Sequence, residues 1–305
     1  MSIVEKMAHY YIGTAGWSYK DWEGIVYPAK KDAGFHALIF LACYINIVEI
    51  NSTFYRPPAL RMSLSWIKKV DGYPDFLFTV KLHQIFTHQR DGFSQKDADE
   101  FKTGIEPLRA HNRLAAILLQ FPWSFARNSR HMDYLTRLFR MFEDFPLALE
   151  IRHSSWDNDQ VFDLLSQYKV SFCNIDQPVI GKSIEPTAVV TNPELSYVRL
   201  HGRNYKNWFN EKSGRDERYD YLYTKDELED WIERIKNLGK RSQKVVVITN
   251  NHYRGQALAN ALQIKNMVTQ EKLDIPLGLL KQYPDLKEIV KKIKSGQMDL
   301  FDQED

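Results

Sequence analysis

The sequence is poor in cysteine, has no strong excess of charge and contains no long hydrophobic run. Its 305 residues include two cysteines, Cys43 and Cys173, both in apolar contexts. Two cysteines cannot form a disulfide framework, so we expect both to be core residues in a reducing compartment. The formal net charge of +2 argues neither for nor against nucleic acid. Because no apolar run reaches membrane-spanning length and no signal-peptide pattern is present, we expect a cytoplasmic protein without a membrane partner.

Short apolar strands alternate with helical segments along most of the chain. Their side-chain periods predict strands over 10–15, 47–54, 76–83, 115–121, 147–153, 170–176, 195–201 and 245–250. Helices are expected over 35–44, 60–70, 94–109, 129–142, 157–168, 224–238 and 255–267, the fifth of them capped by Asp157.

This alternation predicts an α/β fold in which eight strand–helix units close a single (β/α)8 TIM barrel with long βα loops at its C-terminal face. A doubly wound open sheet is the alternative, but no Gly-rich phosphate fingerprint follows the first strand. We expect the barrel to span residues 1–270. Residues 271–305 should form a C-terminal helical extension and an acidic tail, not a separate domain.

The predicted strand over 147–153 carries charged residues that bear on function. The apolar stretch from Leu147 carries Glu150 and Arg152 on one face and ends at His153 and Trp156. Charges on a buried strand are costly unless they are paired or used. Glu150 and Arg152 therefore form either an internal salt bridge or part of a site.

The same period-2 rule places polar side chains on the inner face of most strands, near their C-terminal ends. That end of a barrel is where active sites are built. A salt-bridged plug at the barrel mouth is the alternative, but a plug does not need histidines, asparagines and a glutamine. The expected inner set is Glu49, Asn51, Thr79, Lys81, His83, Gln120, Glu150, Arg152, Asn174, Asp176, Arg199, His201 and either Asn250 or Asn251.

Most of the seven tryptophans follow predicted strands, which puts them on the βα loops at the same end of the barrel. Aromatic rings beside charged groups make stacking platforms for bases or sugars. We expect Trp17, Tyr55 and Trp156 to contact a ligand there. The alternative is that the rings form the apolar core of a lid.

Several sequence blocks together resemble one known family. They are Ile12-Gly13-Thr14-Ala15-Gly16-Trp17-Ser18-Tyr19, Val48-Glu49-Ile50-Asn51-Ser52-Thr53-Phe54-Tyr55, Leu119-Gln120-Phe121-Pro122, Glu150-Ile151-Arg152-His153, and Tyr197-Val198-Arg199-Leu200-His201-Gly202-Arg203. These blocks are similar to those of domain of unknown function 72, the YecE-like proteins. The resemblance implies a TIM barrel from a bacterial or archaeal cytosol and no established reaction.

An anion site is the chemistry that the inner residues favour. Lys81, Arg152 and Arg199 could converge on a phosphate, and Glu49 or Glu150 could act as general base. We therefore expect a phosphate-containing or nucleic-acid-like ligand, with hydrolysis as the reaction if the protein is an enzyme. Catalytic roles are expected for Glu49, Glu150 and His201, and substrate contacts for Trp17, Asn51, Tyr55, Lys81, Gln120, Arg152, Trp156, Asp176, Arg199 and Asn250.

Two other chemistries stay open. Paired carboxylates beside aromatic rings also describe glycosidases, although Glu49 and Glu150 lie on strands far apart around the barrel. Histidines at strand ends raise the alternative of a divalent metal. Zinc needs ligands without competing cations, however, and neither an HxH nor an HExxH spacing occurs. We predict no cofactor and no metal ion, with a divalent metal as the weaker alternative.

The C-terminal tail offers a partner site. Gln297-Met298-Asp299-Leu300-Phe301 resembles the short Gln-Leu-x-Leu-Phe peptide by which bacterial replication and repair proteins dock on the DNA sliding clamp. Gln297, Leu300 and Phe301 would make the contacts, which would make the protein a binding module rather than an enzyme. The alternative is a tail whose apolar residues pack on its own barrel.

Overall fold

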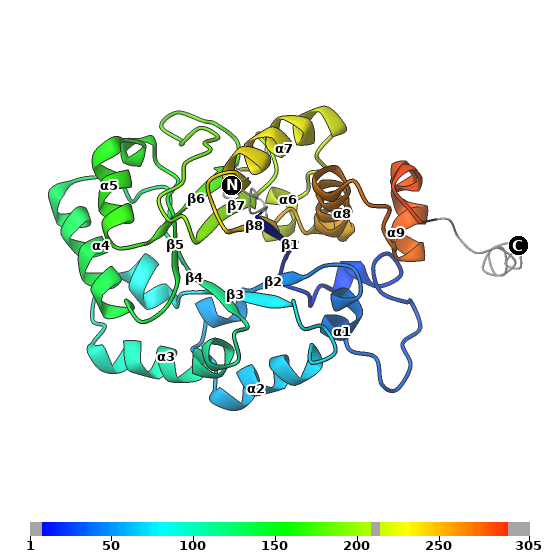
Figure 1. Ribbon diagram of the computed structural model, residues 1–305, viewed down its shortest axis with the longest axis horizontal. Helices are drawn as coiled ribbons and strands as arrows, with labels where there is room; N and C mark the ends of the chain where they lie inside the picture. The colour runs from blue at the N-terminus through cyan, green and yellow to red at the C-terminus, as the bar shows by residue number, and fades with distance from the viewer. Residues whose placement is uncertain (1–7, 209–213, 292–305) are drawn as a thin grey trace, which may run out of the picture.

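A closed parallel barrel forms the body of the protein. The computed structural model describes residues 8–208 and 214–291, and within them eight parallel strands close in sequence order (Figure 1). The strands are β1 (His9–Ala15), β2 (Ile47–Ile50), β3 (Leu77–Lys81), β4 (Leu114–Gln120), β5 (Leu147–Glu150), β6 (Ser171–Asp176), β7 (Leu195–Leu200) and β8 (Lys244–Thr249). The predicted (β/α)8 TIM barrel is confirmed.

Helices surround the ring of strands in Figure 1. They are α1 (Ala37–Ala42), α2 (Leu60–Lys69), α3 (Gln95–Ala110), α4 (Ser129–Met141), α5 (Asp159–Gln167), α6 (Arg215–Arg218), α7 (Lys225–Gly239), α8 (Gln256–Thr269) and α9 (Leu277–Gln282). No described helix joins β6 to β7; a long loop makes that connection.

Sequence chemistry explains the regular elements. The strand β4 is an almost continuous apolar run, as expected for a parallel strand that is covered on both faces. Helix α4 turns Leu135, Leu138 and Phe139 into the core, and the Asn128 side chain caps it by accepting from the His131 N–H. Helix α7 opens with a capping box between Thr224 and Glu227.

Some predicted boundaries and one burial prediction were wrong. The strand β2 ends at Ile50 and β5 at Glu150, each followed by a short 3-10 turn. Helix α5 is capped by Asn158 rather than Asp157, because the Asn158 side chain reaches the Val161 N–H. Cys173 is buried, but Cys43 is exposed at the end of α1, where its sulfur lies 2.9 Å from the Tyr73 hydroxyl.

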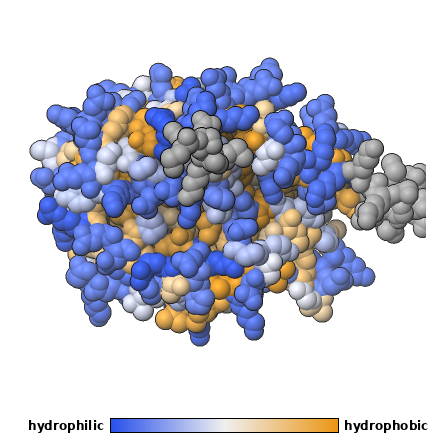
Figure 2. Space-filling view, in the orientation of Figure 1, coloured by the Kyte–Doolittle hydropathy of each residue, from blue (hydrophilic) through white to orange (hydrophobic). Residues whose placement is uncertain are grey.

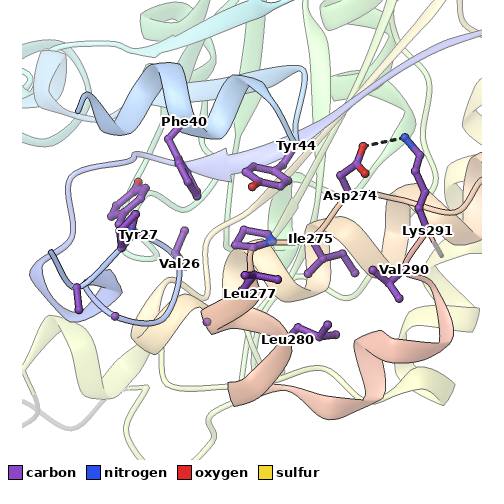
Figure 3. A pocket seen from close by; sticks show the side chains of 15 residues that line it. Val26, Tyr27, Phe40, Tyr44, Asp274, Ile275, Leu277, Leu280, Val290 and Lys291 are labelled. Atoms are coloured by element: carbon purple, nitrogen blue, oxygen red, sulfur yellow. Dashed lines mark hydrogen bonds and ion pairs between the residues drawn. The ribbon is translucent and has the colours of Figure 1, made fainter. Parts of the chain in front are cut away.

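The chain after α8 folds back beside the N-terminal loops. Leu273 pairs with Val290, and Lys291 Nζ binds Asp274 Oδ2 at 2.8 Å. A groove of about 630 Å³ separates this extension from the loop after β1 and from α1, with Tyr27, Phe40 and Tyr44 on one side and Leu277 and Leu280 on the other (Figure 3). The predicted clamp-binding residues Gln297, Leu300 and Phe301 lie outside the described residues.

The face of the molecule shown in Figure 2 is mostly hydrophilic, with hydrophobic residues in patches between the hydrophilic ones. Among the described residues, no helix combines the length and the apolar character needed to cross a bilayer. The cytoplasmic location stays a prediction.

We expect Gly13→Ala to destabilise the barrel. A Cβ at Gly13 would lie 1.8 Å from the carbonyl oxygen of Ile47, so β1 and β2 would have to separate. Overpacking of this kind costs about 1–3 kcal/mol or more in the free energy of unfolding. Urea unfolding measures the change. The control is Gly34→Ala, where a Cβ meets nothing within 4 Å. Equal unfolding free energies for the two variants would contradict the close approach.

Candidate functional site

The parallel register brings the predicted polar residues to one level inside the barrel. Glu49 on β2 pairs with Thr79 on β3, and Gln120 on β4 pairs with Glu150 on β5. Residues paired in adjacent strands share a face of the sheet. The inner phase of β2, β3, β4 and β5 is therefore the phase predicted from the sequence.

One arginine joins both buried glutamates. Arg199 Nη2 donates to Glu49 Oε1 at 2.6 Å, and Arg199 Nη1 donates to Glu150 Oε2. Arg152 Nε donates to the other Glu150 oxygen, Oε1, at 3.0 Å. Below them, the Tyr197 hydroxyl donates to Glu49 Oε2 at 3.0 Å. Glu49 and Glu150 are both 0% exposed, so this is a salt-bridge network in the barrel interior.

The network sets the charge of Glu150. Burial by itself would raise the pKa of that carboxyl, but Arg199, His201 and Arg152 together outweigh burial and hold the pKa well below its usual range. Glu150 is therefore ionised at neutral pH. It accepts hydrogen bonds and has no proton to give, which excludes it as a general acid at that pH.

His201 lies beneath the cavity as a neutral ring. Burial lowers its pKa to about 3, although Glu150 opposes that shift. Its Nδ1 lies 3.0 Å from the Asn250 amide nitrogen, which can only donate. The ring proton is therefore on Nε2, which lies 3.3 Å from Glu150 Oε1. The ring thus holds Glu150 through Nε2 and Asn250 through Nδ1.

A cavity of about 360 Å³ opens above this network. Its described lining includes basic, aromatic and amide side chains and no carboxylate. The lining residues are Tyr19, Asn51, Phe54, Tyr55, Lys81, Gln120, Arg152, Arg199, Arg218, Tyr219, Asn250 and His252. The larger groove in Figure 3 contains none of the predicted site residues.

Three basic side chains of the cavity lining keep unused hydrogen-bond donors. Arg152 commits its Nε to Glu150, and within the described residues its two terminal nitrogens have no hydrogen-bond acceptor. Lys81 Nζ lies 4.0 Å from the centre of the Phe54 ring and, in the same part of the chain, donates to no oxygen. Arg199 Nε is likewise a buried donor without a partner among the residues described.

Most predicted substrate contacts meet in this cavity. Asn51, Tyr55, Lys81, Gln120, Arg152, Arg199 and Asn250 all line it. The structure also settles the phase of the last strand: Asn250 faces the cavity, whereas Asn251 donates to the Tyr221 carbonyl outside the barrel. The predicted catalytic residues Glu49, Glu150 and His201 lie one layer below, without being part of the lining.

Trp17 and Trp156 do not belong to the cavity. Trp156 is fully buried, stacks on Phe125 at 5.2 Å between ring centres, and donates from Nε1 to the Phe125 carbonyl at 2.6 Å. A 3-10 turn after β5 rotates the ring into the core. Trp17 packs edge to face on Trp66 of α2 at 6.2 Å. These two rings therefore agree with the alternative that the loop aromatics pack against each other in an apolar core.

The predicted inner face of β6 was also wrong. Asp176 accepts from Arg203 Nε at 2.9 Å, and Asn174 Oδ1 accepts from the Val189 N–H at 2.7 Å, both outside the ring of strands. Burial raises the pKa of Asp176 despite Arg203. Cys173, which pairs with Tyr197, takes the inner position instead.

Five lining residues were not among the predicted contacts: Tyr19, Phe54, Arg218, Tyr219 and His252. Tyr19 and His252 come from the loops after β1 and β8 and stack at 4.6 Å between ring centres. The polar, aromatic composition of the loop after β7 was a signal for Arg218 and Tyr219. Loop residues follow no strand period, so their facing could not be read from the sequence.

No metal cluster is found in residues 8–208 and 214–291, where no group of three or more His, Cys, Asp or Glu side chains could hold an ion. The buried acids accept from arginines instead. The observed donor set therefore favours an anion over a cation.

Comparison with known proteins identifies the family. The profile of DUF72, a family described as a protein of unknown function, matches residues 11–285. The chain belongs to the DUF72 family. It is 33% identical over 276 residues to the UPF0759 protein YunF of Bacillus subtilis, a match that covers 86% of this chain and 95% of that protein.

Solved structures of DUF72 proteins share the fold. A family member from Thermotoga maritima is 35% identical, with a TM-score of 0.75 over 85% of this chain and 99% of that one. Another, from Enterococcus faecalis, is 25% identical, with a TM-score of 0.77 over 88% and 98% of the two chains. The family resemblance inferred from the sequence blocks is confirmed.

We expect Arg199→Met to destabilise the protein strongly. It leaves Glu49 and Glu150 buried without their shared cation, and breaking a buried pair costs roughly 3–5 kcal/mol. The control is Arg109→Met, which removes an exposed pair with Glu106 and should change stability little. Chemical unfolding at neutral pH measures both variants. A small effect for Arg199→Met would contradict the network.

The pH dependence of stability should also change in this variant. In the wild type the pKa of Glu150 is lower in the folded protein than in the unfolded chain. Ionised Glu150 therefore contributes to stability above the unfolded-state pKa near 4.5, and this contribution is lost as the pH falls. Without Arg199, burial raises that pKa. The difference in stability between Arg199→Met and the wild type should therefore shrink at acidic pH, where Glu150 becomes protonated. Unfolding curves from neutral to acidic pH measure the slope; a constant loss would contradict this cause.

Proposed function

We propose that the cavity at the barrel mouth binds a small phosphate-containing ligand. The observation that carries the proposal is its lining, which contains Lys81, Arg152 and Arg218 and, among the described lining residues, no carboxylate. Arg199 shares its charge between Glu49 and Glu150, whereas the terminal nitrogens of Arg152 have no acceptor among the described residues and remain for a ligand. An anion is the ligand charge that such a lining attracts.

Arg152 is the side chain best placed to bind a phosphate. Its Nε bond to Glu150 and the stacking of its guanidinium over Trp208 at 5.5 Å fix its orientation. The remaining donors of the guanidinium can form the bidentate contacts that arginine makes with phosphate oxygens. A fixed arginine loses little conformational entropy when it binds.

The rest of the lining favours an organic group attached to the phosphate. Gln120 donates from its amide nitrogen to the Phe121 carbonyl, and Asn250 donates to His201. Their amide oxygens have no partner among the described residues and can accept from ligand hydroxyls. The rings of Tyr55 and Tyr219 offer apolar faces for a sugar or a base. The volume of about 360 Å³ suits a small molecule or one nucleotide unit.

The geometry gives less support to a glycosidase. A retaining pair of carboxylates flanks an open space for the sugar, whereas here the Arg199 guanidinium contacts both Glu49 and Glu150. Glu150 is also ionised and cannot serve as the acid. Neither Glu49 nor Glu150 reaches the cavity to act as the base that hydrolysis of a phosphate ester needs, because both are fully buried. Ligand binding is therefore the function that we propose.

We expect Arg152→Ala to weaken phosphate binding about tenfold or more, because it removes a charge-assisted contact. The melting temperature should fall only modestly, since Arg199 still pairs with both glutamates. Calorimetric titration with pyrophosphate, a mononucleotide and a short single-stranded oligonucleotide measures binding. The control is Arg130→Ala on the exposed surface of α4. A collapsed melting temperature with unchanged ligand affinity would favour a purely structural plug.

We also propose, from sequence alone, that residues 297–301 bind a bacterial DNA sliding clamp. A labelled peptide of residues 290–305 should bind purified clamp, and alanine at Leu300 and Phe301 should abolish binding because these side chains would fill the apolar pocket. Fluorescence anisotropy measures the interaction. Replacing Glu304 by glutamine and Asp305 by asparagine is the control for charge. Absence of binding at high micromolar clamp would end the proposal.

A further inference from the structure

Lys81 stands apart from the other cations of the site. It is the last residue of β3, its side chain is half-buried, and it lines the cavity at the barrel mouth. Glu49 and Glu150 accept from Arg199, Arg152 and Tyr197 rather than from Lys81. In residues 8–208 and 214–291 no oxygen accepts a hydrogen bond from Lys81 Nζ, which lies over the Phe54 ring.

This environment favours the neutral amine. Burial lowers the pKa of Lys81 to about 7, and the nearby Arg199 guanidinium lowers it more than either Glu150 or Glu49 raises it. At neutral pH roughly half of such an amine is unprotonated, against roughly one part in a few thousand for an exposed lysine. A neutral lysine amine in a cavity is a nucleophile toward carbonyl carbon.

We propose that Lys81 forms a Schiff base with a phosphate-bearing aldehyde or ketone bound in the mouth cavity. The phosphate part of this inference rests on the function proposed above; the covalent part does not. Arg152 would hold the phosphate, and the carbonyl group would face Lys81 Nζ. No described carboxylate lies in the lining to bind the amine in competition with the ligand.

The reaction balances without an oxidant or reductant. The lone pair of Lys81 Nζ attacks the carbonyl carbon and forms a C–N bond, and the carbonyl oxygen takes up a proton as the nitrogen loses one. The resulting carbinolamine expels its oxygen as water, and a C=N bond replaces the C–O bond. Hydrolysis reverses every step. A protonated imine is an electron sink for a following proton transfer or C–C bond cleavage.

Borohydride trapping of the full-length chain tests the inference. The protein is incubated at neutral pH with pyridoxal phosphate or with the smaller glycolaldehyde phosphate, then reduced, and adducts are counted by intact mass and located by peptide mapping. We expect one dominant adduct, on Lys81, and its loss in Lys81→Met. The labelling rate should rise with pH around the lowered pKa of about 7. Labelling spread over surface lysines and unchanged in Lys81→Met would overturn the proposal.

Lys265 provides a matched control. Burial lowers the pKa of this lysine as well, but its Nζ donates to the Tyr44 carbonyl at 2.9 Å and it is not part of the cavity lining. We expect little label on Lys265, and Lys265→Met should keep the Lys81 adduct. Labelling of Lys265 equal to that of Lys81 would show that burial alone explains reactivity and would overturn the role of the cavity.

A comparison with pyridoxal, which lacks the phosphate, separates the two proposals. Arg152→Ala should reduce the ratio of labelling by pyridoxal phosphate to labelling by pyridoxal roughly tenfold. A change in the reactivity of the Lys81 amine would affect both aldehydes equally and so would not alter this ratio. If both aldehydes label Lys81 equally and phosphate does not compete, the Schiff base stands and the phosphate site fails. If phosphate stabilises the protein against heat but neither phosphorylated aldehyde labels Lys81, the phosphate site stands and the Schiff base fails.

Discussion

The interior of the barrel mouth depends on the contact of Arg199 with Glu49 and Glu150. This contact joins β7 to β2 and β5 across the barrel, with Tyr197 supporting Glu49 from below. A buried ion pair stabilises a fold little compared with apolar packing, but losing one partner is costly. The arrangement therefore fixes where the mouth side chains lie more than it adds to the free energy of unfolding.

The consequences extend to every polar group around the network. Because Arg199 already donates to one oxygen of Glu150, Arg152 donates to the other through its Nε alone. Burial disfavours the charged form of Lys81 most, and the Arg199 guanidinium lowers its pKa further, by more than either glutamate raises it. His201 stays neutral for the related reason that burial outweighs the attraction of Glu150.

Sequence periodicity predicted the barrel and most of its inner face. It succeeded on β2, β3, β5 and β7, where helices cover the outer face and leave the polar positions to the interior. It failed on β6, because a loop instead of a helix follows that strand. The backbone of this loop needs polar partners, and Asn174 supplies one to Val189 from the outer face. A single sequence does not show which strand lacks a covering helix.

The aromatic residues show a second limit of sequence reasoning. Their abundance in the βα loops correctly indicated an aromatic mouth, and Tyr19, Tyr55 and Tyr219 do line the cavity. Trp156 occupies the same kind of position in the sequence but packs against Phe125 in the core. Short 3-10 turns decide between these outcomes, and such turns have no repeating pattern long enough to reveal a buried face. Composition therefore locates the rim without identifying the rings that face a ligand.

The charges at the mouth also constrain any ligand that uses both Arg152 and Lys81. An anion close to Lys81 would favour the charged amine and suppress its nucleophilicity. An anion paired with Arg152 has part of its charge offset there, so it favours the charged amine less than an unpaired anion would. The Nε bond to Glu150 holds Arg152 in place, and Glu150 is itself held by Arg199. The buried network thus separates the position that binds an anion from the position that presents a neutral amine, within one cavity.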